Sequence, residues 1–302
     1  MNAADVSALA MVISAVLYLV AMVLHACEWA SAKGLGATRA ADGGEDAARV
    51  RVDGFTRMGV AATVLAFLAH AVGVVTRGVA AERLPWGNMY EFVTSALLMA
   101  VAIYLILVWR FGMSWLGLFV TLLLAVGQGL AVTVFWVAVA PLVPALHSVW
   151  FIVHIVTACI AAAAFNIGGA ASVLYLLRLR ADERAAKSGV PVTGYLARFD
   201  LDRVDLIAYR MTAFAFPVWT FTIAAGAVWA EYAWGRYWNW DPKETWSFVT
   251  WVIYAGYLHA RSTAGWRGRP AAYIALIGLA SFWFNFVGVN LLFKGMHSYA
   301  GI

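Results

Sequence analysis

Residues 229–246 read WAEYAWGRYWNWDPKETW and separate two long apolar segments, 206–230 and 246–260. The stretch holds five tryptophans and two tyrosines, together with an Asp-Pro pair and two glutamates. A surface that holds a large flat aromatic ligand needs such a cluster, whereas an ordinary hydrophobic span does not. Tryptophan and tyrosine also gather at membrane interfaces with no ligand involved. The stretch therefore indicates a polar, aromatic surface between two membrane segments, and both interpretations remain open at this point.

The composition around this stretch predicts a membrane protein. The chain has 302 residues, of which 64% are hydrophobic and only 12% charged. In soluble domains about half of the residues are apolar and about a quarter are charged. A helix needs roughly 20 apolar residues to cross a bilayer. Eight segments qualify: about 6–27, 59–79, 89–109, 114–137, 149–177, 206–230, 246–260 and 271–293. We expect an all-α, polytopic bundle of about eight transmembrane helices, forming a single membrane domain over residues 1–302.

The distribution of positive charge predicts the orientation in the membrane. If the amino terminus is outside, 16 of the 21 Lys and Arg residues fall in inside loops or at their flanking helix ends. Cytoplasmic loops carry such an excess, so both termini are expected outside, in a multi-pass protein of the cell membrane. The net charge of +5 thus reflects contact with the lipid bilayer, and no nucleic-acid partner is expected.

Two inside loops are long. Residues 28–58 mix Gly, Ala, Asp and Arg, which predicts a mobile connector, and residues 178–205 predict a helix extension, a turn and a short amphipathic helix. The cysteines, Cys27 and Cys159, lie in apolar segments and form no CxxC pair. We interpret them as small buried side chains rather than a dithiol redox centre.

Histidine inside a membrane usually faces a cavity, a partner or a ligand. With the predicted topology, the six histidines sort by depth: His147, His154 and His297 toward the outside, His25 and His259 toward the inner ends, and His70 near mid-span. Haem iron takes axial ligands from two opposite sides, and neutral imidazole suits it. His154 and His297, with the tryptophans between them, predict a bis-histidine haem site whose propionates pair with Arg236 or Lys243.

Local structure explains part of the same pattern. Asp-Pro-Lys-Glu fits a helix start, with Asp241 as the N-cap, Pro242 first in the helix and Glu244 closing a capping box. We expect capping to be the main role of both carboxylates, which also fixes the geometry of the aromatic surface. Ser148 is expected to cap the next helix, which leaves His147 in the loop as a weak ligand candidate. His70 is interpreted as a packing or lining residue.

The segment WGRYWNWDPKETWSFVTWVIYAGYLHAR (234–261) closely resembles the WWD signature of haem-handling proteins of cytochrome c biogenesis. Within them, the chain is most similar to the CcsA/ResC type of System II, called CcsB in actinobacteria. Three further elements carry the resemblance: NMYEF (88–92), SVWFIVH (148–154) and GVNLLFKGMHSYAG (288–301). The region of the first element departs from the family pattern. Members of the family often have a Gly-His pair before its proline, whereas AERLPWGNMYEF (81–92) has Arg83 near that place, so we assign no ligand there.

The resemblance implies a haem-handling subunit of a membrane cytochrome c synthase, a thioether-forming haem lyase that acts with a ResB-type subunit. Haem b would be both substrate and bound ligand, with His154 and His297 as outer axial ligands. The implied shelf consists of Trp234, Trp238, Trp240, Asp241 and Trp246, with Arg236 beside it. His259 would be the inner iron ligand, and His25 is a weak candidate for its partner.

The implied partners are the CxxCH segment of an apocytochrome c, which receives the haem, and a thioredoxin-like protein that keeps its cysteines reduced. Two alternatives remain. A b-type haem electron-transfer protein that never releases its haem would place two histidine pairs near mid-membrane. A scaffold or permease with an aromatic belt would leave the positions of His154 and His297 unexplained.

Overall fold

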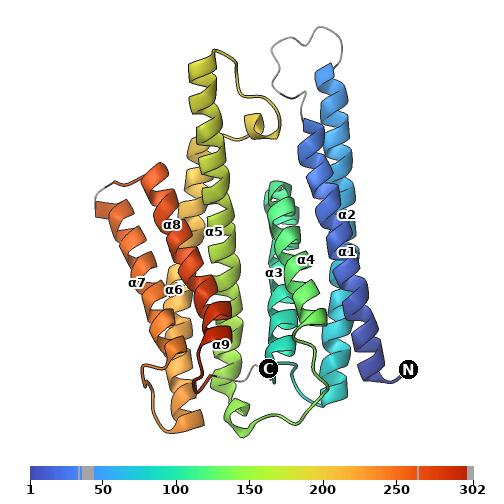
Figure 1. Ribbon diagram of the computed structural model, residues 1–302, viewed down its shortest axis with the longest axis vertical. Helices are drawn as coiled ribbons and strands as arrows, with labels where there is room; N and C mark the ends of the chain where they lie inside the picture. Colours follow the sequence, from blue (N-terminus) through green and yellow to red (C-terminus); the bar gives the residue numbers. More distant parts are fainter. Residues whose placement is uncertain (33–34, 36–43, 264, 298–302) are drawn as a thin grey trace. The chain divides into compact units, whose positions relative to one another are not determined.

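The computed structural model describes residues 1–32, 35, 44–263 and 265–297, and this part of the chain is helical, without strands (Figure 1). It divides into two compact units, residues 1–141 with 177–200, and residues 142–176 with 201–300. One 40-residue helix, α5 (Val149–Ser188), begins in unit 2 and ends in unit 1. The single membrane domain expected from the sequence stays a prediction.

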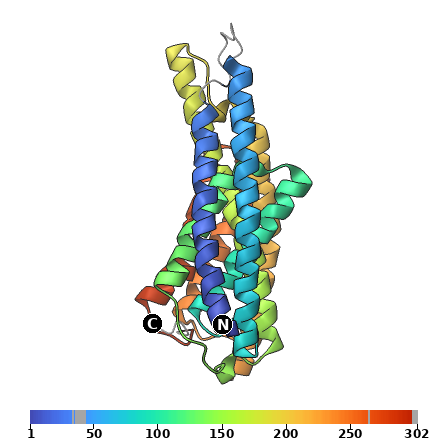
Figure 2. The same cartoon turned by 90° about the vertical axis from the view of Figure 1, so that its right-hand side faces the viewer.

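Unit 1 is built on four helices. Their bounds are α1 Ala3–Ser31, α2 Gly44–Ala81, α3 Met89–Phe111 and α4 Gly117–Thr133, with single turns η2 Ser114–Leu116 and η4 Tyr195–Arg198. α1 and α2 run side by side along most of their length, as Figures 1 and 2 both show. α1 also packs against α4, and α3 against α2 and α4, so α1 has a buried face throughout its length.

The buried faces of this unit have a regular spacing. On α1 the buried positions other than Ala10 alternate steps of four and three residues: 7, 11, 14, 18, 21, 25 and 28. α4 follows the same spacing at 117, 121, 124, 128 and 131. Steps of three and four keep side chains on one helical face. Many of these residues are small or polar, as is common where membrane helices pack closely.

Unit 2 contains α6 Leu201–Trp234, α7 Pro242–Thr263, α8 Arg269–Trp283 and the first part of α5. α8 continues through a π-helical turn, η5 Phe284–Gly288, into α9 Val289–Leu292, and η3 Pro144–Leu146 precedes α5. An aromatic core holds the helices together: the rings of Phe165 and Tyr254 stack at 3.9 Å, and Trp219 and Phe282 pack beside them. Tight aromatic packing of this kind fixes the helix faces against one another.

Seven helices in the described part are long and apolar enough to cross a membrane, which confirms the predicted polytopic bundle. The predicted segment 246–260 forms α7, which has 22 residues but is not among the seven. Its crossing stays a prediction, as does the orientation of the termini.

The expectations for the two loops differ in outcome. The predicted connector 28–58 is partly wrong, because α1 continues to Ser31 and α2 already begins at Gly44; residues 33–34 and 36–43 lie outside the described residues. In the other loop, α5 extends to Ser188 as expected, but the short amphipathic helix is only the turn Tyr195–Arg198.

Candidate functional site

The connection between α6 and α7 is organised by the first residues of α7. Oδ1 of Asp241 accepts a hydrogen bond from the Lys243 backbone N–H at 2.9 Å. The Glu244 carboxylate accepts from the backbone N–H groups of Asn239 at 2.8 Å and Asp241 at 3.1 Å. Pro242 is the first helical residue. The predicted cap is confirmed, and it also holds the preceding loop against the helix.

Trp240 lies between the two N–H groups that Glu244 binds. Its φ angle is +56°, a left-handed conformation that is unfavourable for a bulky residue. This conformation lets Asn239 and Asp241 donate to the same carboxylate oxygen. The side chain of Trp240 is 66% exposed and contacts Trp238 edge-on at 5.7 Å. The cap therefore presents an indole at the surface at the cost of local strain.

Asp241 has a second role beyond capping. Its Oδ1 accepts a hydrogen bond from Nδ1 of His297 at 3.0 Å, and its Oδ2 accepts from the backbone N–H of Met296 at 2.8 Å. A Cβ atom at Gly295 would overlap this carboxylate, so the chain after α9 approaches Asp241 as closely as glycine permits. Burial alone would raise the pKa of Asp241, but the bonds from His297 and the backbone outweigh it and lower the pKa to about 2.

His154 is fixed by the neighbouring helix α6. Its Nδ1 lies 2.9 Å from the carbonyl oxygen of Thr222. One turn further along α6, a Cβ atom at Gly226 would lie only 2.7 Å from the same Nδ1. Gly226 therefore provides the space that the half-buried imidazole occupies.

Trp229 contacts both of these histidines. Its ring is 2% exposed and its Nε1 donates to the carbonyl of Ala145 at 2.8 Å. The His154 ring lies nearly parallel to it, at 5.9 Å and 22°, and the His297 ring meets its edge at 5.6 Å and 67°. Trp234 also contacts His297, at 4.8 Å. The structure thus brings His154 and His297 to one tryptophan from segments 143 residues apart (297 − 154).

The hydrogen bonds of the two histidines select the same tautomer. The carbonyl of Thr222 accepts only, and so does the ionised carboxylate of Asp241, so each Nδ1 must carry the proton. In the neutral imidazole, the form that binds a metal, the lone pair is then on Nε2, and the bonded Nδ1 fixes the ring orientation. In both residues Nε2 is therefore the ring nitrogen that is not used in the contact with Thr222 or Asp241.

A family model described as "Cytochrome C assembly protein" matches residues 61–297. The chain belongs to the cytochrome c assembly protein family. Among curated members, the cytochrome c biogenesis protein CcsA of Guillardia theta is 36% identical over 80% of this chain and 85% of its own length. CcsA of Picosynechococcus is 32% identical over 84% and 90%, and CcsA of Porphyra purpurea 30% over 82% and 89%.

A solved structure shares the fold. The cytochrome c haem lyase CcmF matches 98% of this chain with a TM-score of 0.59, at 16% sequence identity. This chain spans about half the length of that protein (48%). Together with the family match, these findings identify a CcsA-type cytochrome c biogenesis protein, a multi-pass membrane protein with a haem-handling role in cytochrome c assembly.

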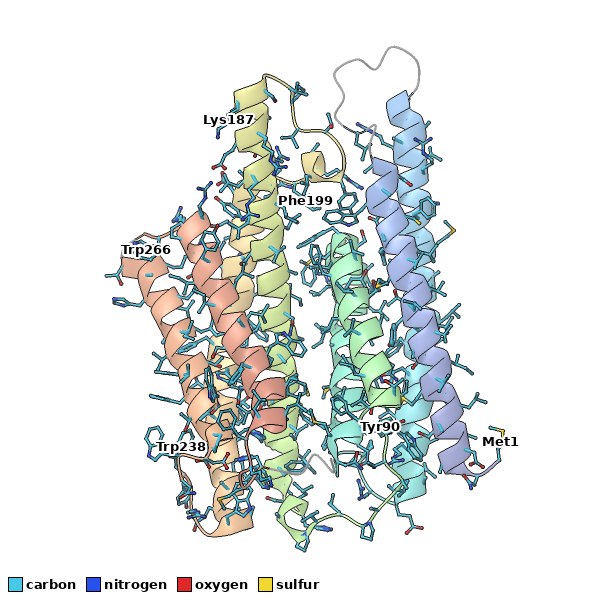
Figure 3. All side chains as sticks on the ribbon, viewed as in Figure 1. Met1, Tyr90, Lys187, Phe199, Trp238 and Trp266 are labelled. Atoms are coloured by element: carbon cyan, nitrogen blue, oxygen red, sulfur yellow. The ribbon has the colours of Figure 1, made fainter. Side chains whose placement is uncertain are left out.

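In this cytochrome c assembly protein the other predicted shelf residues lie in two further groups. Trp240 contacts Phe248 at 6.2 Å as well as Trp238, and Trp246 packs against Phe284 of the π-helical turn at 4.3 Å. The tryptophans thus surround the start of α7 (Figure 3, where Trp238 is labelled). Trp229 and Trp234, rather than the later tryptophans, contact the histidines.

The two predicted propionate partners differ in exposure. Arg236 is exposed and donates to Oδ1 of Asn239 at 3.0 Å and to the sulfur of Met296 at 3.2 Å, next to His297. Lys243 is half-buried, and its Nζ donates to Oδ1 of Asn290 at 2.8 Å. Arg236 is therefore the more accessible cation beside the two histidines.

The remaining histidines lie elsewhere. His259 is exposed near the far end of α7, with Nδ1 3.3 Å from Oγ1 of Thr263; 18 residues separate it from Asp241, about 27 Å along a helix. His147 is exposed in the loop, as predicted, and the Ser148 hydroxyl accepts from the backbone N–H of Trp150. His25 and His70 are fully buried in unit 1.

Four residues of the site were not predicted from the sequence as contacts of the histidines: Thr222, Gly226, Trp229 and Gly295. Thr222 acts through its backbone carbonyl and the glycines through their missing side chains, so residue type alone gives no signal. Trp229 lies within the quoted aromatic stretch, and its position at the end of an apolar segment was the only available sign.

Proposed function

We propose that this protein holds haem b at the predicted outer end of unit 2 and presents it for attachment to an apocytochrome c. The observation that supports this most directly is the shared arrangement of His154 and His297. Both border Trp229, and both have Nδ1 bonded to a fixed acceptor, which leaves Nε2 available for iron. Two such nitrogens, one from α5 and one from the segment after α9, match a bis-histidine haem ligand set.

Each residue around the pair has a physical role in this proposal. Thr222 and Asp241 orient the two imidazoles, and the negative charge of Asp241 makes His297 the stronger donor to iron. Trp234 and the exposed Trp240 provide flat apolar surface for the porphyrin. Arg236, and secondarily Lys243, would pair with the propionates.

The attachment reaction depends mainly on the orientation of the CxxCH thiols relative to the haem vinyl groups. Each CxxCH thiol adds across a haem vinyl group, so a sulfur–carbon bond forms and the thiol proton ends on the other vinyl carbon. A haem held at fixed orientation removes much of the entropy cost of bringing thiol and vinyl together. The CxxCH histidine then takes the place of one protein ligand.

The same proposal includes the other partners. Haem would reach the outer site from an inner one at His259, whose exposed imidazole leaves room for a second ligand from a ResB-type subunit of a System II synthase. A thioredoxin-like protein would keep the substrate cysteines reduced. We do not assign His25 to iron, because Cβ atoms at Gly59 and Gly117 would overlap or touch its ring, which leaves no space for a porphyrin between these backbones.

A b-type electron-transfer protein remains the second candidate. It is less well supported, because the two histidines that share a neighbour lie next to a surface loop, beside the exposed residues Arg236 and Trp240. Such a position favours transfer of haem to a partner over permanent storage.

The test is the reduced absorption spectrum of the protein purified with its ResB-type subunit, as wild type, His154→Ala and His297→Ala. We expect b-type haem in wild type, its loss in both variants, and recovery when imidazole replaces the missing ligand. His147→Ala is the matched control and should keep its haem. Haem content that is unchanged in both ligand variants would exclude this site.

A further inference from the structure

Lys243, the second residue of α7, is held by the turn and the short helix that follow α8. Its Nζ donates to Oδ1 of Asn290 at 2.8 Å and to the carbonyl oxygen of Phe286 at 3.4 Å. The ring of Phe286 lies 5.9 Å from the same nitrogen. Both acceptors are neutral oxygens, so neither bond cancels the positive charge of the ammonium.

The π-helical turn η5 provides the position of these acceptors. Phe286 lies in the middle of η5, and Asn290 lies in α9, which continues it. Nδ2 of Asn290 donates to the Phe286 carbonyl at 2.7 Å, so its Oδ1 is left to face the lysine. Both η5 and α9 pack against α7. Turns of this kind are frequent at functional sites, and this one fixes a charged nitrogen.

The Lys243 ammonium lies near both proposed iron ligands. Its charge is close enough to the His154 imidazole to act on it. It also interacts with the charge of the Asp241 carboxylate, which accepts from Nδ1 of His297 at 3.0 Å. Charges interact over several ångströms in a protein interior. Lys243 can therefore influence an iron centre between the two histidines without touching the haem.

The surroundings of Lys243 make its positive charge unfavourable. Burial lowers the pKa of the ammonium to about 7, although the Asp241 carboxylate acts in the opposite direction. An ammonium held in this way is stabilised by any further negative charge nearby. A haem that takes up one electron supplies such a charge. By the same coupling, the ammonium stabilises the reduced iron relative to the oxidised iron.

A positive charge at this place would offset an effect of Asp241. The carboxylate behind His297 strengthens the ligand and adds negative charge, which favours ferric iron. Ferric iron is unsuited to the proposed attachment reaction, because two thiolates that each give one electron to ferric iron become a disulfide. The disulfide has no thiol left to add to a vinyl group. A site that orients His297 with a carboxylate therefore benefits from a compensating cation.

We propose that Lys243 raises the reduction potential of the haem iron held by His154 and His297. The inference rests on the proposed haem site and concerns a property that this site gives to its iron. Lys243 neither gives nor takes an electron, and it changes only the equilibrium between ferric and ferrous iron. The exposed Arg236 stays the main partner of the propionates, because Asn290 and Phe286 already hold the Lys243 ammonium.

The test is a redox titration of the haem spectrum at pH 6, in the full-length protein purified with its partner subunit. Lys243→Met removes the charge and keeps an unbranched side chain, and Lys243→Arg keeps the charge. At a fixed potential we expect the ratio of ferrous to ferric haem to fall about tenfold in Lys243→Met. This is a shift of about 59 mV for one electron. Lys243→Arg should stay near wild type.

A second variant leaves the lysine in place. Asn290→Asp puts a carboxylate against Nζ of Lys243 and should lower the ferrous-to-ferric ratio in the same direction. It decides the question in the same way if Lys243→Met binds no haem. Lys294→Gln is the matched control, because it removes a positive charge from an exposed side chain three residues from His297. Water and salt screen an exposed charge, so this variant should keep the wild-type ratio.

The outcomes separate this inference from the haem site itself. A wild-type ratio in Lys243→Met and Asn290→Asp, with the bis-histidine spectrum intact, would overturn the role of Lys243 and leave the haem site standing. An equal fall in Lys243→Met and Lys243→Arg would assign the effect to packing and would also overturn it. Haem missing from wild type would overturn the site and the inference together.

Discussion

Nδ1 of His297 lies 3.0 Å from Oδ1 of Asp241, the residue that caps α7. One carboxylate therefore begins a helix and orients an imidazole that follows 56 residues later (297 − 241). The hydrogen bonds from His297 and from the backbone lower the pKa of Asp241 to about 2 and so keep it ionised at neutral pH. In the proposed haem site this carboxylate would both orient and strengthen His297 as a ligand.

Replacing Asp241 by Asn separates these roles. Asn still caps a helix and still accepts a hydrogen bond from His297, but it brings no negative charge. We expect roughly a 10- to 100-fold loss of haem affinity, with unchanged helix content by circular dichroism. Haem transfer to apomyoglobin measures the affinity. Asp241→Ala should lose the cap as well, and an affinity of Asp241→Asn equal to wild type would show that the charge has no role.

The pH dependence of the same pair follows from the pKa of Asp241. Because the pKa is lowered from 3.8 to about 2, the ionised carboxylate contributes stability that is complete above pH 4. This contribution, on the order of 2 kcal/mol, is lost as the pH falls through 2. The affinity difference between wild type and Asp241→Asn should therefore stay constant from pH 7 to 5. A difference that shrinks across this range would mean that Asp241 titrates near neutrality.

Gly226 tests the position of His154. An added methyl group at this residue would lie 2.7 Å from Nδ1 of His154, so Gly226→Ala must move the ring away from the Thr222 carbonyl. We expect haem loss comparable with His154→Ala, while the protein stays folded. Gly256→Ala is the control, since no atom lies within 4 Å of its added Cβ; it should keep its haem and gain about 0.5–1 kcal/mol of stability. Equal haem retention in the two variants would contradict the described contact.

Local features of this site were predictable from the sequence and its long-range contacts were not. The Asp241 cap was predicted because Asp, Pro and Glu act within four residues of chain. The bonds His154–Thr222 and His297–Asp241 join segments 68 and 56 residues apart, and they depend on how α5, α6 and the chain after α9 pack. The helices were predictable from the length of the apolar segments for the same reason that the cap was predictable. Both depend on residues that are close together in the chain.

The polar interior of unit 1 was missed for a different reason. α1 also presents large apolar side chains such as Leu9 and Val16 on its exposed face. Its overall composition therefore indicates only a membrane span. The steps of seven and four residues between Ser7, Ser14, Tyr18 and His25 become visible once one face is known to be buried. Ser7, Tyr18 and Gln128 have partners on other helices, so these pairs required the structure.

The backbone strain at Trp240 and the role of its indole ring can be tested separately. Its left-handed φ of +56° costs about 1–2 kcal/mol for a residue with a Cβ atom. Trp240→Gly should relieve that strain and Trp240→Ala should not, so the glycine variant should be the more thermally stable of the two. Both remove the exposed indole, and both should weaken haem binding equally if the ring is part of the shelf. Normal haem affinity in both variants would restrict Trp240 to the membrane interface.

His259 tests whether two haem positions exist. About 27 Å of helix separates it from Asp241, so it cannot bind the same iron as His297. In His259→Ala, purified with the ResB-type subunit, we expect little haem at the outer site after growth, because delivery is blocked. Haem added to the purified variant should restore the bis-histidine spectrum in full, whereas His297→Ala should regain it only with imidazole. If haem added to His259→Ala fails to bind, His259 supports the outer site itself, and a separate inner position is no longer needed.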